Sequence, residues 1–167
     1  MNRVIVVGPS GAGKSYFSKA LAKVTDFPLY HLDNIFWNDD KTHISRDEFD
    51  KKLLSILEQE KWIIDGDYSR TYEIRMKYAD TIYFLDFPLE AALKGVESRI
   101  GKRRDDIPWK EESFDDEFKE WIINWFQETK PKLLNYLSLY KDKNIIVFHS
   151  RDEVDNYLKV SFATKKA

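Results

Sequence analysis

The stretch Gly8-Pro9-Ser10-Gly11-Ala12-Gly13-Lys14-Ser15 decides the fold of this chain. It matches the spacing G-x-x-x-x-G-K-[ST], and it directly follows the apolar run Val4-Ile5-Val6-Val7. A buried strand, a glycine-rich turn and a helix, in that order, are the context that a phosphate-binding loop requires. The glycines let backbone N–H groups turn toward an anion, and the following helix points its positive end to the same place.

This loop supplies the first candidate site residues. Lys14 can reach the β- and γ-phosphates of ATP, and the Ser15 hydroxyl can ligate Mg²⁺, so we expect ATP and Mg²⁺ as cofactors. The competing interpretation is a plain glycine-rich turn with an exposed lysine. The expected nucleotide-binding residues are Gly8, Pro9, Ser10, Gly11, Ala12, Gly13, Lys14, Ser15 and Tyr16.

The bulk composition narrows the class of protein. A length of 167 residues suits a single domain, residues 1–167, with a sizeable core. The net charge of −2 gives no electrostatic reason to expect a nucleic-acid or acidic-membrane partner. The sequence has no cysteine, which excludes disulfides and zinc–thiolate sites, and its apolar runs are too short to span a bilayer. This composition is compatible with a reducing cytosol, and we expect a cytoplasmic protein. We also expect a monomer or weak homodimer.

Short apolar strands alternate with helical segments along the chain. The apolar runs show almost no alternation, as is typical of parallel strands that are covered on both faces. This pattern predicts an α/β fold with a doubly wound, five-stranded parallel sheet. Ser45 and Ser113 are expected helix caps, Pro131 is expected to break or kink a helix, and a loose tail is expected at Lys165-Lys166-Ala167. The expected strands are residues 2–7, 28–32, 62–64, 81–85 and 144–148.

Acidic residues follow three of the expected strands. In a parallel sheet, ligands bind beyond the carboxyl ends of the strands. Asp65 could hold Mg²⁺ opposite Ser15, or it could simply stop its strand in an Asp-Gly turn. Asp33 could bind an acceptor hydroxyl or act as its base, or it could cap a helix. For Asp86 we expect only a turn.

Four arginines are candidates for anion contacts. Arg99 and Arg103 are four residues apart, and on one helix face they could grip phosphate oxygens and stabilise transition-state charge. The alternative for both is a basic helix end that complements the helix dipole. Arg70 could reach a phosphate on an acceptor. Arg75 is expected to be exposed and Arg104 to be solvated.

The acidic segment 105–117 lies between two helices. It is interpreted as part of a flap over the site, with a lid at about residues 102–116, or else as a solvated loop. Trp121 and Trp125 occupy an apolar helical face and are expected in the core. No catalytic role is expected for His31 or the other two histidines, because their spacing does not resemble that of ligands.

Several segments together resemble a known group of enzymes. The loop GPSGAGKS, WIIDGDYSRT (62–71), DTIYFLDFP (80–88) and RIGKRR (99–104) come in the order seen in adenylate kinases and related small P-loop kinases. HLDNIFW (31–37) and WIINWF (121–126) are similar to a bacterial branch called "DNA topology modulation protein". The resemblance implies the strand order 2-3-1-4-5, ATP in the loop and a small helical lid after Arg99. It also implies that Arg99 and Arg103 contact nucleotide or phosphate.

Two departures from adenylate kinases bear on the acceptor. The segment from Asp65 to Arg70 has one extra residue and lacks a proline, and no arginine occurs between Asp105 and Ser150. Lysines are weak substitutes for arginines there. We expect a Mg²⁺/ATP phosphotransferase whose acceptor is a nucleoside monophosphate or a hydroxyl-bearing metabolite. The alternative is a nucleotide-binding regulator that acts on DNA or a protein partner. The candidate substitutes are Lys119, Lys130 and Lys132.

Overall fold

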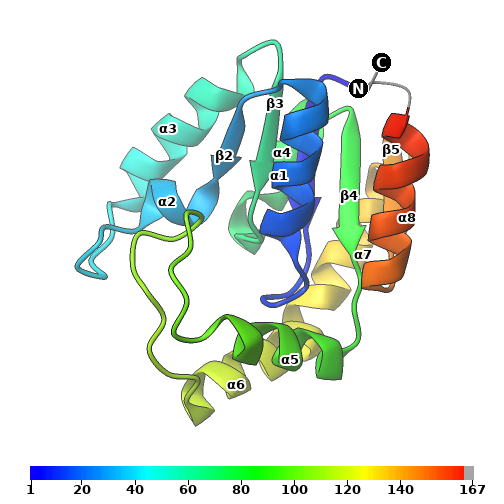
Figure 1. Ribbon diagram of the computed structural model, residues 1–167. Helices are drawn as coiled ribbons and strands as arrows, with labels where there is room; N and C mark the ends of the chain where they lie inside the picture. The colour runs from blue at the N-terminus through cyan, green and yellow to red at the C-terminus, as the bar shows by residue number, and fades with distance from the viewer. Residues whose placement is uncertain (164–167) are drawn as a thin grey trace.

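A five-stranded, all-parallel sheet forms the centre of the computed structural model, which describes residues 1–163 (Figure 1). The strand order β2-β3-β1-β4-β5 confirms the predicted topology. The tail predicted at Lys165-Lys166-Ala167 lies outside the described residues. The strands are β1 (Arg3–Val7), β2 (Leu29–His31), β3 (Trp62–Asp65), β4 (Thr81–Leu85) and β5 (Asn144–Phe148).

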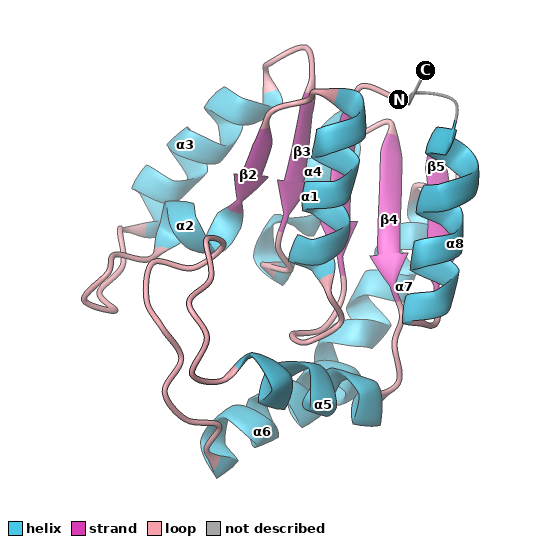
Figure 2. Cartoon of the chain, in the orientation of Figure 1, coloured by secondary structure: helices cyan, strands magenta, loops and turns pink. Residues whose placement is uncertain are grey.

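Helices cover both faces of the sheet. In Figure 2, α1 and α8 lie in front of the strands, and α4 and α7 lie behind them. Two short non-α segments accompany these helices, a 3₁₀ turn η1 (Ser69–Thr71) and a π-helical turn η2 (Trp125–Thr129). The α-helices are α1 (Lys14–Thr25), α2 (Leu32–Phe36), α3 (Arg46–Leu57), α4 (Tyr72–Tyr78), α5 (Leu89–Arg99), α6 (Asp116–Asn124), α7 (Lys130–Leu139) and α8 (Arg151–Phe162).

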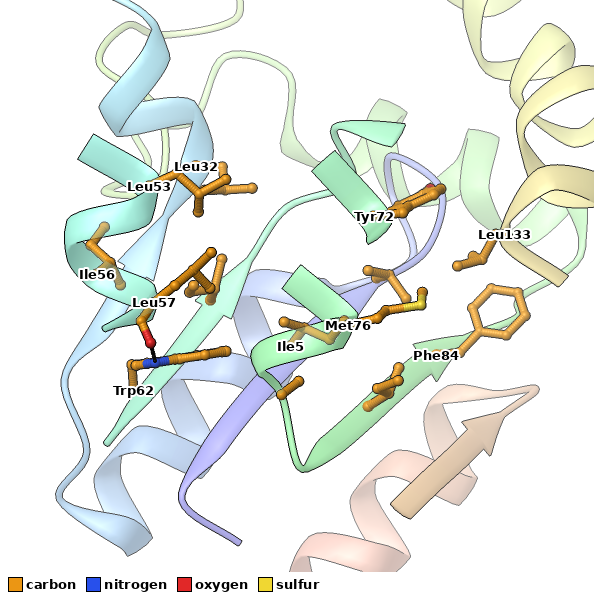
Figure 3. Packing of buried hydrophobic residues seen from close by; sticks show 14 of the residues in the cluster. Ile5, Leu32, Leu53, Ile56, Leu57, Trp62, Tyr72, Met76, Phe84 and Leu133 are labelled. Carbon is orange, nitrogen blue, oxygen red and sulfur yellow. Dashed lines mark hydrogen bonds between the residues drawn. The ribbon is translucent and has the colours of Figure 1, made fainter. Parts of the chain in front are cut away.

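Alternate residues of β1 enter two different apolar layers. Val4 and Val6 pack with residues of α1 and α8, whereas Ile5 packs with residues of α3, α4 and α7. Figure 3 shows the second layer, in which Ile5 lies near Met76 of α4. Burial of one such aliphatic side chain contributes about 1.5–3 kcal/mol. Hydrophobic burial on both faces therefore fixes the strand at the centre of the sheet.

The loop after α5 differs from its prediction. Residues 100–115 form turns and bends, so the expected small helical lid is wrong, and helix α6 begins only at Asp116. Asp115, rather than Ser113, caps α6 by accepting a hydrogen bond from the N–H of Phe118 at 2.8 Å. Pro131 does not break the chain of helices, because it occupies the first turn of α7, where its missing N–H costs little.

The loop 100–115 nevertheless extends from α5 toward α2, which follows the edge strand β2. Asp105 pairs with Lys19 of α1, and its carbonyl oxygen accepts a hydrogen bond from Asn34 Nδ2 of α2 at 2.7 Å. Figure 1 shows the loop, in green and yellow-green, reaching from α5 and α6 toward α2. Within residues 1–163, no helix combines the length and the apolar character that a bilayer crossing needs.

Candidate functional site

A cavity of about 1120 Å³ lies at the carboxyl ends of the central strands. One end, here called the loop end, is formed by Arg99, Arg151 and five residues of the loop after β1 and the start of α1, namely Ser10, Gly11, Gly13, Lys14 and Ser15. The other end, here called the aromatic end, is formed by residues of α2, the segment after β3 and the loop 100–115. The aromatic end consists of Asp33, Phe36, Trp37, Tyr68 and Trp109.

The loop end holds a lysine ammonium against backbone oxygens. Gly13, in the left-handed conformation with φ 87°, precedes the first residue of α1, Lys14. Lys14 Nζ donates hydrogen bonds of 2.9 Å to the carbonyl oxygens of Gly8 and Pro9. Burial lowers the pKa of Lys14, although nearby carboxylates oppose the change. Because its partners are neutral, the positive charge stays available to an anion in the loop.

Helix α5 contacts the loop through a glycine that the sequence analysis missed. A Cβ on Gly95 would lie only 2.0 Å from the carbonyl oxygen of Gly11. A Cβ on Gly11 would in turn lie 2.0 Å from the carbonyl oxygen of Ala92. Both positions therefore require glycine, because the two backbones touch. A lone glycine inside an otherwise helical segment was the only sequence signal.

Arg99 lies at the loop end, and its contact with nucleotide or phosphate stays a prediction. Its Nη2 donates a hydrogen bond of 3.0 Å to Ser10 Oγ. Its Nε lies 3.1 Å from Glu111 Oε1, but the N–H is not aligned for a hydrogen bond and has no other partner among the described residues. Burial, together with the neighbouring Arg104, lowers the pKa of Arg99. The guanidinium thus keeps an unused donor beside the loop.

Arg104 lines the cavity, whereas Arg103, for which a phosphate contact was predicted, does not. Helix α5 ends at Arg99, and Gly101 then adopts a φ of 76°, so residue 103 does not share the helix face. Arg103 is exposed and does not line the cavity. Arg104 is half-buried and pairs with Asp106 and with Glu111, the latter at 2.5 Å. The prediction of a solvated Arg104 was therefore wrong.

Asp106 connects the loop 100–115 to the loop end. Ser15 Oγ donates a hydrogen bond of 2.5 Å to Asp106 Oδ2. Burial disfavours the charged carboxylate, but the hydrogen bonds from Arg104 and Ser15 prevail and lower the pKa of Asp106 to about 2. Nothing in the local sequence distinguishes this residue from the other acids of the segment, so the sequence analysis missed it.

Asp65 lies at the end of β3, is only 5% exposed and lines the cavity. His31, at the end of the neighbouring strand β2, places its Nδ1 2.9 Å from Asp65 Oδ2. Burial opposes charge on the imidazole, yet the hydrogen bond and negative charge of Asp65 raise the pKa of His31 overall. No catalytic role was expected for His31, because the spacing of the histidines does not resemble that of ligands. Spacing could not reveal its pairing with Asp65, which lies 34 residues further along the chain.

Asp67 is a further carboxylate that the sequence analysis missed. Its Oδ1 accepts a hydrogen bond of 3.3 Å from the N–H of Gly8, and its Oδ2 accepts one from Trp125 Nε1. The residue therefore connects the segment after β3 with the loop and with η2. Trp125 is 4% exposed and belongs to the core, as predicted, although it also lines the cavity. Trp121 is 55% exposed and lines the cavity, so the predicted core position is wrong for this residue.

Arg75 supports the segment that carries Asp67. The sequence analysis expected an exposed side chain, but Arg75 is 0% exposed. It donates hydrogen bonds to Thr71 Oγ1 at 2.9 Å and to the carbonyl oxygens of Gly66 at 2.8 Å, of Tyr68 at 3.3 Å and of Asp67. Its guanidinium thus has structural partners and does not line the cavity.

Arg70, predicted to contact an acceptor phosphate, lies elsewhere. Its side chain is 45% exposed and makes two hydrogen bonds to Asp50, of 2.8 and 3.1 Å. It does not line the cavity. The lysines considered as substitutes for arginines, Lys119, Lys130 and Lys132, also lie outside the cavity lining. Lys130 pairs with Asp86 at 2.8 Å, in agreement with a structural role for that aspartate.

The aromatic end is centred on Asp33. Tyr68 donates a hydrogen bond of 2.6 Å from its hydroxyl to Asp33 Oδ1. Burial raises the pKa of Asp33, while the Tyr68 hydrogen bond and Lys14 oppose the change. Rings continue from there toward the loop 100–115: Tyr68 and Phe36 have centroids 5.6 Å apart, and Trp37 lies 5.0 Å from Phe36.

Tyr16 lies just outside the cavity, behind the loop end. The Arg151 guanidinium sits 3.9 Å from the centre of the Tyr16 ring, and Tyr16 donates a hydrogen bond of 2.9 Å to Asp155. Arg151 itself lines the cavity beside Gly13. Tyr16 thus positions a cavity cation rather than facing the cavity. Gly8, Pro9 and Ala12 likewise shape the loop without lining the cavity.

The cavity contains oxygen donors that suit a hard cation. Ser15 and Asp65 offer oxygen ligands, which Mg²⁺ prefers. Among residues 1–163, no three His, Asp or Glu side chains are grouped closely enough to bind a metal alone. Such a group is not required, because Mg²⁺ usually keeps several waters and binds through one or two carboxylates plus substrate phosphates.

No family model and no curated protein matches the chain, but solved structures do. A shikimate kinase from Acinetobacter baumannii, in complex with shikimate, has a TM-score of 0.60 and 16% identity, over 100% of this chain and 96% of that chain. A shikimate kinase from Bacteroides thetaiotaomicron has a TM-score of 0.63 and 17% identity, with 96% of each chain covered. A deoxyadenosine kinase from M. mycoides with bound dATP has a TM-score of 0.55 and 12% identity, over 96% of this chain and 99% of that chain.

The chain therefore has the fold of small-molecule P-loop kinases. The strand order, the helices on both faces and the position of the glycine-rich loop agree with that class. At these identities the likeness establishes the fold alone, and the chemistry must be argued from the cavity itself.

Proposed function

We propose that this protein is a Mg²⁺/ATP-dependent phosphotransferase that moves the γ-phosphoryl group of ATP to a small-molecule acceptor. The observation that carries the proposal is that one cavity contains both the lysine-bearing loop and the half-buried carboxylate of Asp33. Phosphoryl transfer is achieved mainly by positioning and by electrostatic stabilisation, and these two features supply both.

Each residue at the loop end has a place in this proposal. The backbone N–H groups of residues 10–15 and the Lys14 ammonium bind the phosphates, and Arg99 stabilises charge on the migrating group. Ser15 and Asp65 hold Mg²⁺, which neutralises phosphate charge when it is bound. Asp106 must release the Ser15 hydroxyl for this, so we expect the loop 100–115 to act as a lid, as the sequence predicted for residues 102–116.

Asp33 provides the acceptor chemistry. The acceptor oxygen forms a bond to the γ-phosphorus while the bond from that phosphorus to the β,γ-bridging oxygen breaks, and ADP leaves. The hydroxyl proton passes to the Asp33 carboxylate. Burial raises the pKa of Asp33, which makes it a stronger base than an exposed aspartate.

The finer assignments extend the same proposal. The resemblance to the "DNA topology modulation protein" branch, a cytoplasmic location and a monomer or weak homodimer remain predictions. The positions of Arg70 and Arg103 outside the cavity argue against an adenylate kinase activity, because neither can bind an acceptor phosphate from there.

A coupled ADP-release assay tests the proposal. The panel contains nucleosides, nucleoside monophosphates and hydroxyl-bearing metabolites, with Mg²⁺ and ATP present throughout. We expect at least one acceptor to raise ADP release well above slow ATP hydrolysis, and Lys14→Ala to remove the increase. If no acceptor raises the rate, the proposed transfer is wrong.

A further inference from the structure

The cavity has more carboxylates than cations, and most of its cations belong to the loop end, although Lys14 acts to lower the pKa of Asp33 and Asp33 acts to raise the pKa of Arg104. Among the described residues that line the cavity, eight carry carboxylates and five carry cationic side chains. Lys14, Arg99 and Arg151 belong to the loop end, and Arg104 is engaged by Asp106 and Glu111. The fifth cation, Lys41, is an exposed side chain whose Nζ lies 5.9 Å from the ring centre of Trp109.

Arg70 and Arg75, which follow Tyr68 in the sequence, supply no charge to the aromatic end. Arg70 is held by Asp50 at the surface, and Arg75 is buried and donates its hydrogen bonds to Thr71 and to backbone oxygens. An anionic acceptor group placed beside Asp33 would also meet the negative charges of Asp65 and Asp106, which act to raise the pKa of Asp33. Like charges at such short range disfavour binding strongly.

Aromatic rings, rather than cationic side chains, line most of the aromatic end. From Asp33 outward, Tyr68, Phe36, Trp37 and Trp109 form a continuous series, each with its centroid 5.0–5.6 Å from the next. All four side chains are half-buried and line the cavity. Partly exposed rings next to a hydrogen-bonding carboxylate suit a ligand that has a flat face and a hydroxyl group.

We propose, on the basis of the phosphotransferase function above, that the acceptor is a hydroxyl-bearing ring compound that carries no phosphate or carboxylate, such as a nucleoside. Its ring lies against the aromatic end, and its hydroxyl donates to Asp33. The transfer gives its phosphate monoester and ADP, and the proton released from the hydroxyl goes first to Asp33. Of the two acceptor classes that the sequence left open, this inference selects the hydroxyl-bearing metabolite over the nucleoside monophosphate.

Neutral and anionic acceptors, compared side by side, test the inference on the intact protein. ADP release is measured with adenosine, cytidine and thymidine, with their 5′-monophosphates, and with shikimate as a hydroxylated ring carboxylate. We expect at least one nucleoside to exceed every monophosphate and the carboxylate by about 100-fold or more in kcat/KM. A monophosphate or carboxylate as the preferred acceptor overturns the inference, and so does a lack of turnover with all three nucleosides.

Two variants separate ring binding from charge binding. Trp109→Leu removes a ring of the aromatic end and should raise KM for the nucleoside about tenfold with little change in kcat. Lys41→Ala is the matched control, because it removes the nearby cation and should leave both constants within about twofold. The opposite pattern, in which Lys41→Ala raises KM and Trp109→Leu does not, contradicts the inference.

Calorimetry with Mg²⁺ and ATP distinguishes this inference from the proposed function. If ATP binds and a monophosphate is the preferred acceptor, the phosphotransferase stands and only the acceptor class is wrong. If ATP does not bind, the phosphotransferase itself is wrong.

Discussion

The two ends of the cavity are built in different ways. The loop end comes mostly from one continuous stretch, residues 10–15, whose backbone and lysine form the anion site. The aromatic end is assembled from Asp33, Tyr68 and Trp109, which lie in three separate segments. Phosphate binding is therefore encoded locally, whereas acceptor binding depends on how distant segments pack.

The largest effect is expected at the loop end. Lys14→Ala removes the charge that faces the phosphates, so kcat/KM for ATP should fall by about 100-fold or more. Steady-state ADP release measures the loss. Thermal unfolding of the same variant serves as the control, and a melting temperature close to wild type assigns the loss to binding and chemistry. An unchanged kcat/KM would mean that the loop does not bind the transferred phosphate.

A loss of similar size, but in kcat rather than in kcat/KM for ATP, is expected from a substitution at the aromatic end. Asp33→Asn keeps the shape of the side chain but removes the base, so kcat should fall by about 100-fold or more. Calorimetric ATP affinity should stay within about threefold, because Asp33 faces the acceptor. Asp50→Asn, at an exposed carboxylate outside the cavity, is the matched control. Equal effects of the two substitutions would remove Asp33 from the chemistry.

Substitutions of two arginines that look alike in sequence should change the free energy of unfolding by different amounts. Arg75→Leu leaves the carbonyl oxygens of Gly66, Asp67 and Tyr68 without their donor, which should cost about 3 kcal/mol of unfolding free energy. Arg70→Leu breaks only an exposed ion pair and should cost about 0.5 kcal/mol. Urea denaturation measures both. Similar values for the two variants would contradict the structural role of Arg75.

A substitution at the contact between α5 and the loop after β1 should have a smaller effect on stability, and the sign of that effect tests the contact. An alanine within a helix normally stabilises it by about 1 kcal/mol relative to glycine. Gly95→Ala should instead destabilise by about 1–3 kcal/mol and weaken ATP binding, because the methyl group meets the backbone of Gly11. Gly101→Ala, where a Cβ meets nothing within 4 Å, should cost only the strain of its positive φ and spare ATP affinity. A stabilised Gly95→Ala variant would disprove the contact.

The smallest change is expected in the pH dependence. The base form of Asp33 is lost as the pH falls through its pKa, so kcat should decline on the acid side. The Tyr68 hydrogen bond lowers that pKa, and Tyr68→Phe removes it. The acid limb of the kcat profile should therefore move to higher pH in the variant. A shift to lower pH would contradict the assignment of Asp33 as the base.

The two ends also explain which features could be predicted from sequence. The parallel sheet followed from the glycine-rich loop and the unalternating strands, and the strand order followed from the family resemblance. Asp33, Asp65 and Arg99, which were chosen from the sequence, all line the cavity, and their roles stay predictions. Arg103 was chosen in place of Arg104, because helical periodicity was extended past Arg99, where the chain leaves the helix. Such helix ends depend on local turns that periodicity does not reveal.

The remaining misses share one cause. The burial of Arg75, the contact of Asp106 with Ser15 and the glycine requirement at Gly95 all arise from tertiary packing between distant segments. No spacing along the chain encodes those contacts. The residues of the aromatic end were partly visible as an aromatic-rich sequence, but their arrangement around Asp33 was not.

The central claim is that the loop end is a triphosphate site, and isothermal titration of the wild-type protein with ATP in the presence of Mg²⁺ tests it most directly. We predict a single saturable binding event with a Kd below about 1 mM, which Lys14→Ala weakens strongly. The absence of any heat of association at millimolar ATP or GTP, in a protein that remains folded, would contradict it.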